Sequence, residues 1–232
     1  MLNPKISVII CCYKQAQFLK KAIDCVLNQT YKNYEIIVVD DASPDNVGEV
    51  IQEYKSLPNF RYIKLNENKG LGIARNIGVS AATGNWIIPL DSDDTIDVTY
   101  MEKTIKAVKN FDTVVYTKTA TVQGTSINYT DWIRDNVSLK SLIQANAFPV
   151  TCLFSKVAFN KVGGYIEERE HMQVTDWDLW INLMSSGCEF VFVPEHLYFH
   201  TFHDSNMTTA TTNAGAWGKH EQYLKNKYKD FA

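Results

Sequence analysis

No run of apolar residues in this sequence approaches the roughly 20 that a membrane-spanning helix needs. The longest runs, such as Ile6–Cys12, are far shorter, so we expect no transmembrane segment and at most a peripheral contact with a membrane. The residues from Met1 to Lys5 lead straight into that run, so we also expect no signal peptide.

Neither sign of charge is in excess. Lys and Arg number 23 against 26 Asp and Glu, which gives a formal net charge of -3 at pH 7. A domain that attracts nucleic acid through its overall field carries a clear excess of positive charge. We therefore do not expect nucleic acid to be a partner.

Cysteine is scarce and has no paired spacing. The five cysteines, at positions 11, 12, 25, 152 and 188, are odd in number. They show neither the short repeated spacing of a zinc site nor a disulfide framework. We expect them to be reduced, mostly buried, and part of a cytosolic protein.

Internal repeats and linker-like segments are also absent, whereas 45% of the 232 residues are hydrophobic. That share is enough to build one large core. We therefore expect one continuous domain.

The first half alternates β-branched runs with stretches of helical periodicity. Ser43, followed by Pro44, is predicted to cap a helix. Alternation of this kind predicts an α/β fold, with a mostly parallel central sheet and helices on both faces. Strands are predicted at residues 6–12, 35–39, 60–65 and 86–90, and helices at 18–27, 47–54 and 73–81.

The second half is less regular. Residues 117–136 are rich in Thr and Asn and give no clear pattern, and residues 201–214 are predicted to be a mobile segment before a last helix at about 216–228. Helices are predicted at 98–108, 139–143, 157–162 and 175–186, and strands at 113–116, 148–154 and 189–193, the last ending at Pro194.

Three carboxylates crowd the end of the fourth predicted strand, in Asp91-Ser92-Asp93-Asp94. In open parallel sheets, ligands bind beyond the carboxyl ends of the strands. Two carboxylates about 4 Å apart repel each other by ~4 kcal/mol at an effective dielectric near 20. A divalent cation such as Mg²⁺ or Mn²⁺ would relieve that repulsion, because it prefers oxygen ligands. The alternative is a turn in which one Asp caps the next helix.

A second acidic pair, Asp40 and Asp41, ends another strand of the same predicted sheet. A carboxylate at that edge can accept hydrogen bonds from a pyrimidine N–H or from ribose hydroxyls. We take Asp40 as the ligand contact and Asp41 as part of the loop.

Arg75 lies one turn into the predicted helix that follows Gly70-Leu71-Gly72. A helix start with an Arg suits an anion such as a diphosphate, and an exposed salt bridge is the alternative. These glycines complete neither a Walker motif nor a dinucleotide fingerprint.

Asp176 and His203 are the remaining candidates. Asp176 lies at a predicted helix start, where a carboxylate is also a favourable cap. Its neighbours Trp177 and Trp180 suit a sugar ring, but their spacing favours core packing. His203 follows the last predicted strand and could coordinate a metal or lie in a solvated loop.

Taken in order, these segments resemble the family 2 glycosyltransferases with the GT-A fold. Each segment alone is short, whereas the ordered set covers most of the chain. The matching segments are Ile6 to Tyr13, Val26 to Tyr31, Ile37 to Ser43, Asn68 to Gly70, Ala74 to Asn76, Leu90 to Asp94, Val162 to Tyr165 and Asp176 to Trp180.

The resemblance implies that residues 1–97 bind a nucleotide-sugar and residues 98–232 form the acceptor side of a GT-A type domain. The implied reaction is inverting transfer of a sugar, from a UDP-sugar, to a hydroxyl of a saccharide or lipid-linked saccharide in glycan or polysaccharide synthesis. By position, the donor contacts would be Cys11, Tyr13, Asp40, Arg75, Asp91 and Ser92, the ligands of Mn²⁺ or Mg²⁺ would be Asp91, Asp93 and His203, and the catalytic base would be Asp176.

Two other functions fit the same residues. A metal-dependent nucleotidyltransferase uses a similar sheet and acidic pair, but it needs a Gly-rich phosphate loop with an Arg after the first strand. That loop reads Cys12-Tyr13-Lys14-Gln15 here. A non-catalytic nucleotide- or sugar-binding subunit would keep the site without turnover.

Overall fold

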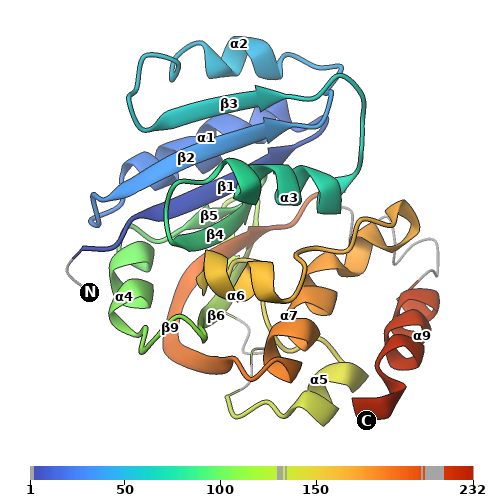
Figure 1. The fold of residues 1–232 in the computed structure, drawn as a ribbon. Coiled ribbons are helices and arrows are strands. Elements are labelled where there is room, and N and C mark those ends of the chain that lie inside the picture. Colours follow the sequence, from blue (N-terminus) through green and yellow to red (C-terminus); the bar gives the residue numbers. More distant parts are fainter. Residues whose placement is uncertain (1–2, 130–132, 134, 205, 207–216, 232) are drawn as a thin grey trace.

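Four parallel strands form the centre of the molecule in the computed structural model, which describes residues 3–129, 133, 135–204, 206 and 217–231. Their spatial order is β3-β2-β1-β4, and the short strand β8 (Phe154–Ser155) adds an antiparallel edge beside β4. The predicted α/β fold is confirmed (Figure 1). The parallel strands are β1 (Ile6–Cys12), β2 (Tyr34–Asp40), β3 (Phe60–Lys64) and β4 (Trp86–Asp91).

Helices cover both faces of this sheet, because alternate residues of a strand point to opposite sides. Ile6 and Val8 of β1 belong to a buried cluster with residues of α1 and α2, whereas Ile9 belongs to another cluster with residues of α3. Every residue of β1 and β2 is buried, as their apolar runs predict. The helices are α1 (Ala16–Leu27), α2 (Val47–Ile51) and α3 (Leu71–Ala81).

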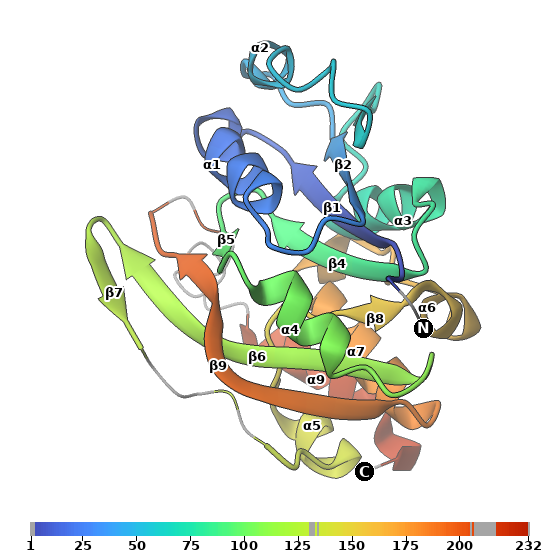
Figure 2. The same cartoon turned by 90° about the vertical axis from the view of Figure 1, so that its left-hand side faces the viewer.

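A second sheet, in the order β5-β9-β6-β7, was not predicted. Its long strands β6 and β9 run parallel, and its short strands β5 and β7 pair antiparallel with β9 and β6. Figure 2 shows β6 and β7 as a hairpin that projects from the body of the molecule. The strands are β5 (Thr95–Ile96), β6 (Thr113–Gln123), β7 (Ser126–Asn128) and β9 (Glu189–Thr201).

The predicted end of a strand at Pro194 is wrong, because β9 continues to Thr201. The pairing register jumps there: Val193 lies opposite Thr117, and His196 lies opposite the next residue of β6. Pro194 thus lies in an irregularity of the ladder, where its missing N–H leaves no broken hydrogen bond.

The helices of the second half lie near their predicted places. The predicted strand at 148–154 is wrong, since only Phe154 and Ser155 form a strand and Leu153 makes a single bridge to Val115. Most of the segment predicted to be mobile lies outside the described residues. The elements are α4 (Tyr100–Lys106), α5 (Leu139–Gln144), α6 (Lys156–Lys161), η1 (Arg169–Val174), α7 (Thr175–Ser185), α9 (Trp217–Lys227) and η2 (Lys229–Phe231).

The prediction that Ser43 caps a helix is also wrong. Helix α2 begins after Asn46, and Ser43 instead donates its hydroxyl hydrogen to the Cys12 carbonyl at 3.3 Å. The same hydroxyl accepts the backbone N–H of Lys14, so Ser43 joins the ends of β1 and β2.

All five cysteines are free thiols, and all except Cys25 are buried. Among the helices of the described residues, none combines the length and the apolar character needed to cross a bilayer.

Glu35 at the start of β2 holds the turn between α3 and β4. Its Oε1 accepts hydrogen bonds from the Ser7 hydroxyl and the Thr83 N–H, each at 2.6 Å, and from the Gly84 N–H. Burial alone would raise the pKa of Glu35, but these hydrogen bonds and the charge of Lys5 lower it to about 2. The ionised side chain is therefore part of the folded structure.

We expect Glu35→Gln to lower the free energy of unfolding at pH 7 by about 3 kcal/mol, because the lowered pKa stabilises the fold wherever the unfolded state would be ionised. The difference from the wild type should shrink as the pH falls from 4.5 towards 2. Urea denaturation across that range measures it. Glu67→Gln is the control, since the Glu67 side chain is 76% exposed. Equal stabilities of wild type and Glu35→Gln at pH 7 would contradict this assignment.

Candidate functional site

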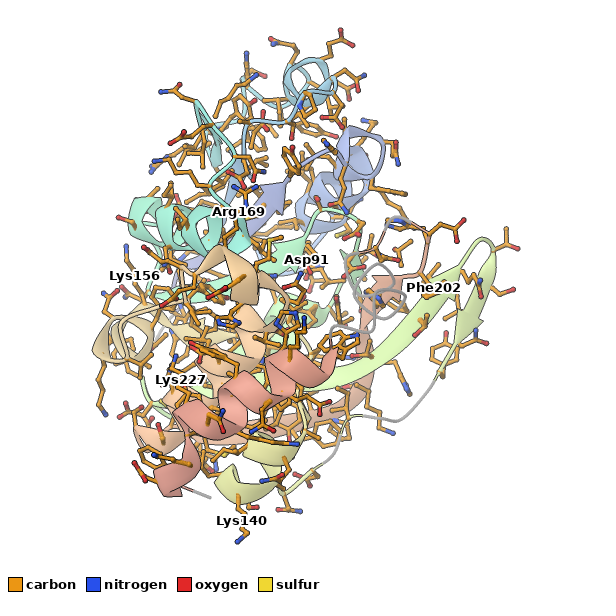
Figure 3. All side chains as sticks on the ribbon, turned by 90° about the vertical axis from the view of Figure 1, so that its right-hand side faces the viewer. Asp91, Lys140, Lys156, Arg169, Phe202 and Lys227 are labelled. Atoms are coloured by element: carbon orange, nitrogen blue, oxygen red, sulfur yellow. The ribbon has the colours of Figure 1, made fainter. Side chains whose placement is uncertain are left out.

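A cavity of about 820 Å³ opens beyond the carboxyl ends of β1, β2 and β4 and reaches into the second half of the chain. Figure 3 shows Asp91 of β4 and Arg169 of η1 on the same side of the molecule. The topology thus brings residues of both halves to one site. The predicted site residues that line it are Cys11, Tyr13, Arg75, Asp91, Asp93 and Asp176.

Arg75 is buried and joins the two halves at the cavity wall. Its guanidinium donates to Asp91 Oδ1 at 2.7 Å and to the Thr175 hydroxyl at 2.8 Å. The guanidinium also lies 5.3 Å from the centre of the Tyr165 ring. The alternative of an exposed salt bridge is therefore wrong: the ion pair exists, but Arg75 is only 3% exposed.

One face of α3 forms the seam between the halves. Gly72, Arg75 and Asn76 share that face, since residues three and four apart are neighbours on a helix. Asn76 Nδ2 donates to the Tyr165 carbonyl, and Asn76 Oδ1 accepts the Tyr165 N–H, both at 2.9 Å. A Cβ on Gly72 would lie only 1.9 Å from the Ile166 carbonyl oxygen, so the backbones touch here.

Asp93 is surrounded by polar side chains. Its Oδ2 accepts hydrogen bonds from Gln15 Nε2 at 2.9 Å and Asn206 Nδ2 at 3.0 Å, and lies 3.0 Å from His203 Nε2. Burial, followed by the charges of Asp94 and Asp91, raises the pKa of Asp93 to about 6. Crowded carboxylates of this kind are stabilised by positive charge.

His203 does not lie in a solvated loop, because it contacts Asp93 and its ring stacks on Phe18 with 4.4 Å between ring centres. It is not among the residues that line the cavity. Two carboxylates and an imidazole suit Mn²⁺ chemically. Among the described residues, however, no three acidic, His or Cys side chains converge as a metal-binding group, and the Asp91 carboxylate is turned towards Arg75.

Asp94 has a structural role that the sequence did not reveal. Its carboxylate accepts the Tyr198 hydroxyl and, at 2.7 Å, the Thr201 N–H, and it lies 3.3 Å from His200 Nδ1. Burial by itself would lower the pKa of His200, but Asp94 raises it to about 9. Asp94 therefore fixes the end of β9 against the end of β4 rather than capping a helix.

Two predicted donor contacts lie behind the cavity wall. Asp40 is fully buried, and its oxygens accept the Ser43 N–H at 2.7 Å and the Tyr62 hydroxyl at 2.6 Å. Ser92 is also fully buried and donates to Gln15 Oε1. Neither is among the residues that line the cavity.

Asp41 lines the cavity in place of Asp40. Its two oxygens accept the backbone N–H groups of Lys69 and Gly70 at 2.7 and 2.8 Å. Gly70 has a φ of 96°, which a residue with a side chain rarely adopts. Asp41 therefore has the loop role expected from the sequence and also a position on the cavity wall.

Asp176 begins α7 and is partly buried. Asn146 Nδ2 lies 3.4 Å from its Oδ2. Burial raises the pKa of Asp176, and the positive charge of Arg75 opposes that rise. The neighbouring tryptophans are packed, as their spacing predicts: Trp180 is fully buried, and the indole N–H of Trp177 donates to the Leu142 carbonyl at 2.7 Å.

Cys11 and Tyr13 line the cavity at the end of β1, Cys11 as a buried residue and Tyr13 as an exposed one. Burial raises the pKa of Cys11 to about 12, so its thiol stays neutral. The Tyr13 ring is 40% exposed. The amides Gln15, Asn146 and Asn206 belong to the same site and were missed, because isolated amides carry no sequence pattern.

Comparison with protein families gives a match to the model of Glycosyl transferase family 2 over residues 7–161. Among curated proteins, glycosyltransferase GlyA of Streptococcus pneumoniae is 38% identical over 48% of this chain and 16% of its own length. Cholesterol galactosyltransferase of Borreliella burgdorferi is 34% identical over 63% of this chain and 39% of its own. A glycosyltransferase of Rickettsia typhi is 29% identical over 91% of this chain and 68% of its own. The chain thus spans less than half of the first two.

Two solved structures share the fold. S. aureus TarS in complex with UDP-GlcNAc has a TM-score of 0.74 and 19% identity, over 89% of this chain and 61% of that one. The mannosyltransferase PcManGT from Pyrobaculum calidifontis, in complex with GDP-Man and Mn²⁺, has a TM-score of 0.69 and 16% identity, over 89% and 59% of the two chains.

We expect Gly72→Ala to lower the free energy of unfolding by about 1–3 kcal/mol, because the added methyl group would force α3 away from Ile166. Gly48→Ala in α2 is the matched control. A Cβ at Gly48 meets no atom within 4 Å, so this change should stabilise the protein by about 0.5–1 kcal/mol. Urea denaturation of both variants measures the contrast. Equal changes in the free energy of unfolding for Gly72→Ala and Gly48→Ala would show that α3 and Ile166 are not in close contact.

Proposed function

The chain belongs to glycosyl transferase family 2, and we propose that it transfers a sugar from a nucleoside diphosphate donor to an acceptor hydroxyl. The observation that carries the proposal is the shared cavity, which Asp91 and Asp93 line together with Asp176. One acidic group can thus face the diphosphate while another faces the acceptor, as a transfer between two bound substrates requires.

We assign the nucleoside of a UDP-sugar to the part of the cavity at Cys11, Tyr13 and Asp41. The Tyr13 ring offers an aromatic face to the base. Each Asp41 oxygen accepts one backbone hydrogen bond and keeps a lone pair for a pyrimidine N–H. Asp41 therefore replaces Asp40 as the proposed contact. The UDP-GlcNAc complex of TarS supports uracil as the base.

The diphosphate would lie beside Arg75 and the pair formed by Asp93 and His203. A divalent cation bound there would stabilise the negative charge that grows on the departing nucleoside diphosphate. Asp91, Asp93 and His203 would hold it, and the Mn²⁺ in the PcManGT complex supports its use in this fold. Arg75 would add a second positive charge while keeping Asp91 in place.

Asp176 is the proposed catalytic base. It would accept the proton of the acceptor hydroxyl as the hydroxyl oxygen attacks the anomeric carbon on the side opposite the leaving group, so one displacement inverts that carbon. Burial raises the pKa of Asp176, which makes its carboxylate a stronger base, and the positive charge of Arg75 opposes that rise.

Family membership favours this reaction over nucleotidyl transfer. A non-catalytic binding subunit is distinguished by experiment, since an active transferase hydrolyses its nucleotide-sugar slowly when water replaces the acceptor. The five free thiols support the cytosol as the place of action.

We expect Asp176→Asn to keep the donor affinity and to lower the rate of sugar transfer at least about 100-fold, because an amide cannot accept the proton. Calorimetry with UDP and a transfer assay measure the two quantities. Asp112→Asn, at an exposed position outside the cavity, is the control. Wild-type turnover of Asp176→Asn would show that the base lies elsewhere.

We expect Asp93→Asn to remove the part of the UDP affinity that depends on Mn²⁺, a loss of about tenfold or more, because the amide is a weaker cation ligand. Calorimetric titrations with and without Mn²⁺ isolate that part. Asp230→Asn, at an exposed position in η2, should bind UDP as the wild type does. An unchanged response of Asp93→Asn to Mn²⁺ would refute the metal assignment.

A further inference from the structure

Helix α9 presents two neighbouring stripes of side chains. His220 and Leu224 of α9 and Tyr228, the residue that follows the helix, are spaced by four residues and are buried in the protein. Trp217 and Glu221, also four residues apart, line the cavity. Residues four apart lie on one face of a helix, so α9 packs with one stripe and forms part of the cavity wall with the other.

The last turn of α9 is anchored to the helix that carries the proposed base. Lys227 Nζ and the Tyr228 hydroxyl each lie 2.7 Å from Asp178 Oδ1. The Asp178 side chain is only 2% exposed and belongs to α7, two residues after Asp176. Figure 3 labels Lys227 on α9, on the side of the molecule where Asp91 is seen. These contacts hold the C-terminal end of α9 against α7.

The cavity wall offers hydrogen-bonding groups that have no partner among the residues that the structure describes. Gln173 of η1 lines the cavity, and its Oε1 is buried without a hydrogen bond. Thr119 of β6 lines it as well, is only 2% exposed, and its Oγ1 also lacks a partner. A buried polar atom without a hydrogen bond destabilises the protein, so these atoms are suited to a hydroxyl-rich ligand.

The cavity lining carries charges of both signs, and they lie in different places. Glu221 and Asp176 line it with carboxyl groups, whereas the guanidinium of Arg169 donates to the backbone carbonyl and the side-chain oxygen of Asn68, at 2.9 and 2.5 Å, beside Gly70. The imidazole of His200 lies against Asp94. Lys14, another lining cation, lies over the Tyr13 ring, so Lys14 and Arg169 both belong to the part of the cavity proposed for the nucleoside. An anionic acceptor against α9 would instead meet Glu221 and Asp176.

We infer that α9 forms the acceptor subsite for an uncharged saccharide, with the Trp217 ring beneath the sugar and Glu221, Gln173 and Thr119 bonded to its hydroxyls. This assignment rests on the proposed function. An aromatic face with surrounding hydrogen-bond acceptors matches a pyranose, which has apolar C–H faces and a polar rim. A sterol would leave the same polar groups unpaired.

A panel of acceptors with one UDP-sugar donor and Mn²⁺ tests the substrate class. We expect transfer to methyl glycosides of glucose, galactose or N-acetylglucosamine, a kcat/KM about tenfold or more lower for methyl glucuronide, and none to cholesterol in micelles. Hydrolysis of several UDP-sugars without any acceptor is measured first, to choose the donor. If none of them is hydrolysed, the proposed function itself is refuted. If the donor is hydrolysed but its sugar is transferred only to cholesterol or to methyl glucuronide, or to no member of the panel, the assignment of a saccharide subsite is wrong.

Variants of α9 test the residues. Trp217→Ala should raise the KM for the best neutral saccharide about tenfold without changing the donor KM, and Trp217→Phe should restore the acceptor KM. Lys219→Ala is the control on the same helix, since Lys219 is exposed and does not line the cavity.

Glu221→Gln should raise the kcat/KM for methyl glucuronide relative to methyl glucoside about fivefold. An unchanged acceptor KM in Trp217→Ala, or an unchanged ratio in Glu221→Gln, overturns the assignment.

Discussion

The buried guanidinium of Arg75 holds the site together. It bonds Asp91 at the end of β4 and Thr175 at the start of α7, and so ties the two halves of the chain together at the cavity. A buried charge is tolerated only when it is paired and hydrogen-bonded. If Asp91 or Thr175 moved away, the guanidinium would be buried without a partner. The relative position of Asp91 and Asp176 follows from this one side chain and from the close approach of α3 at Gly72.

Much of the parallel sheet could be predicted from sequence, because strands buried on both faces have a continuous apolar pattern. The runs of β1 and β2 are the clearest examples. The second sheet could not be predicted: β6 continues through a Thr-rich stretch, and β9 continues through Pro194, which a bulge accommodates. Residues 148–153 show the opposite failure, since they are mostly apolar and mostly buried without forming a strand. Burial, rather than strand pairing, explains their composition.

The sequence was enough to predict that the site lies at the carboxyl ends of the strands. It was not enough to predict which side chains face the cavity. Asp40 and Asp41 are adjacent acids, and only their backbone geometry turns Asp41 to the cavity and Asp40 into the protein. Asp94 is equally acidic and anchors β9 instead of facing a ligand. The cavity stripe of α9 was invisible in the sequence, because a polar helix reveals its two faces only when the buried one is known.

The central claim is that acids of both halves form one nucleotide-sugar site, with a divalent cation held beside Asp93. Anomalous diffraction from crystals grown with UDP and Mn²⁺ tests this claim most directly. The account predicts a manganese peak at coordination distance from Asp93, with the diphosphate on its far side and the uracil ring near Tyr13 and Asp41. UDP bound outside this cavity, or a manganese ion away from Asp93, would contradict it.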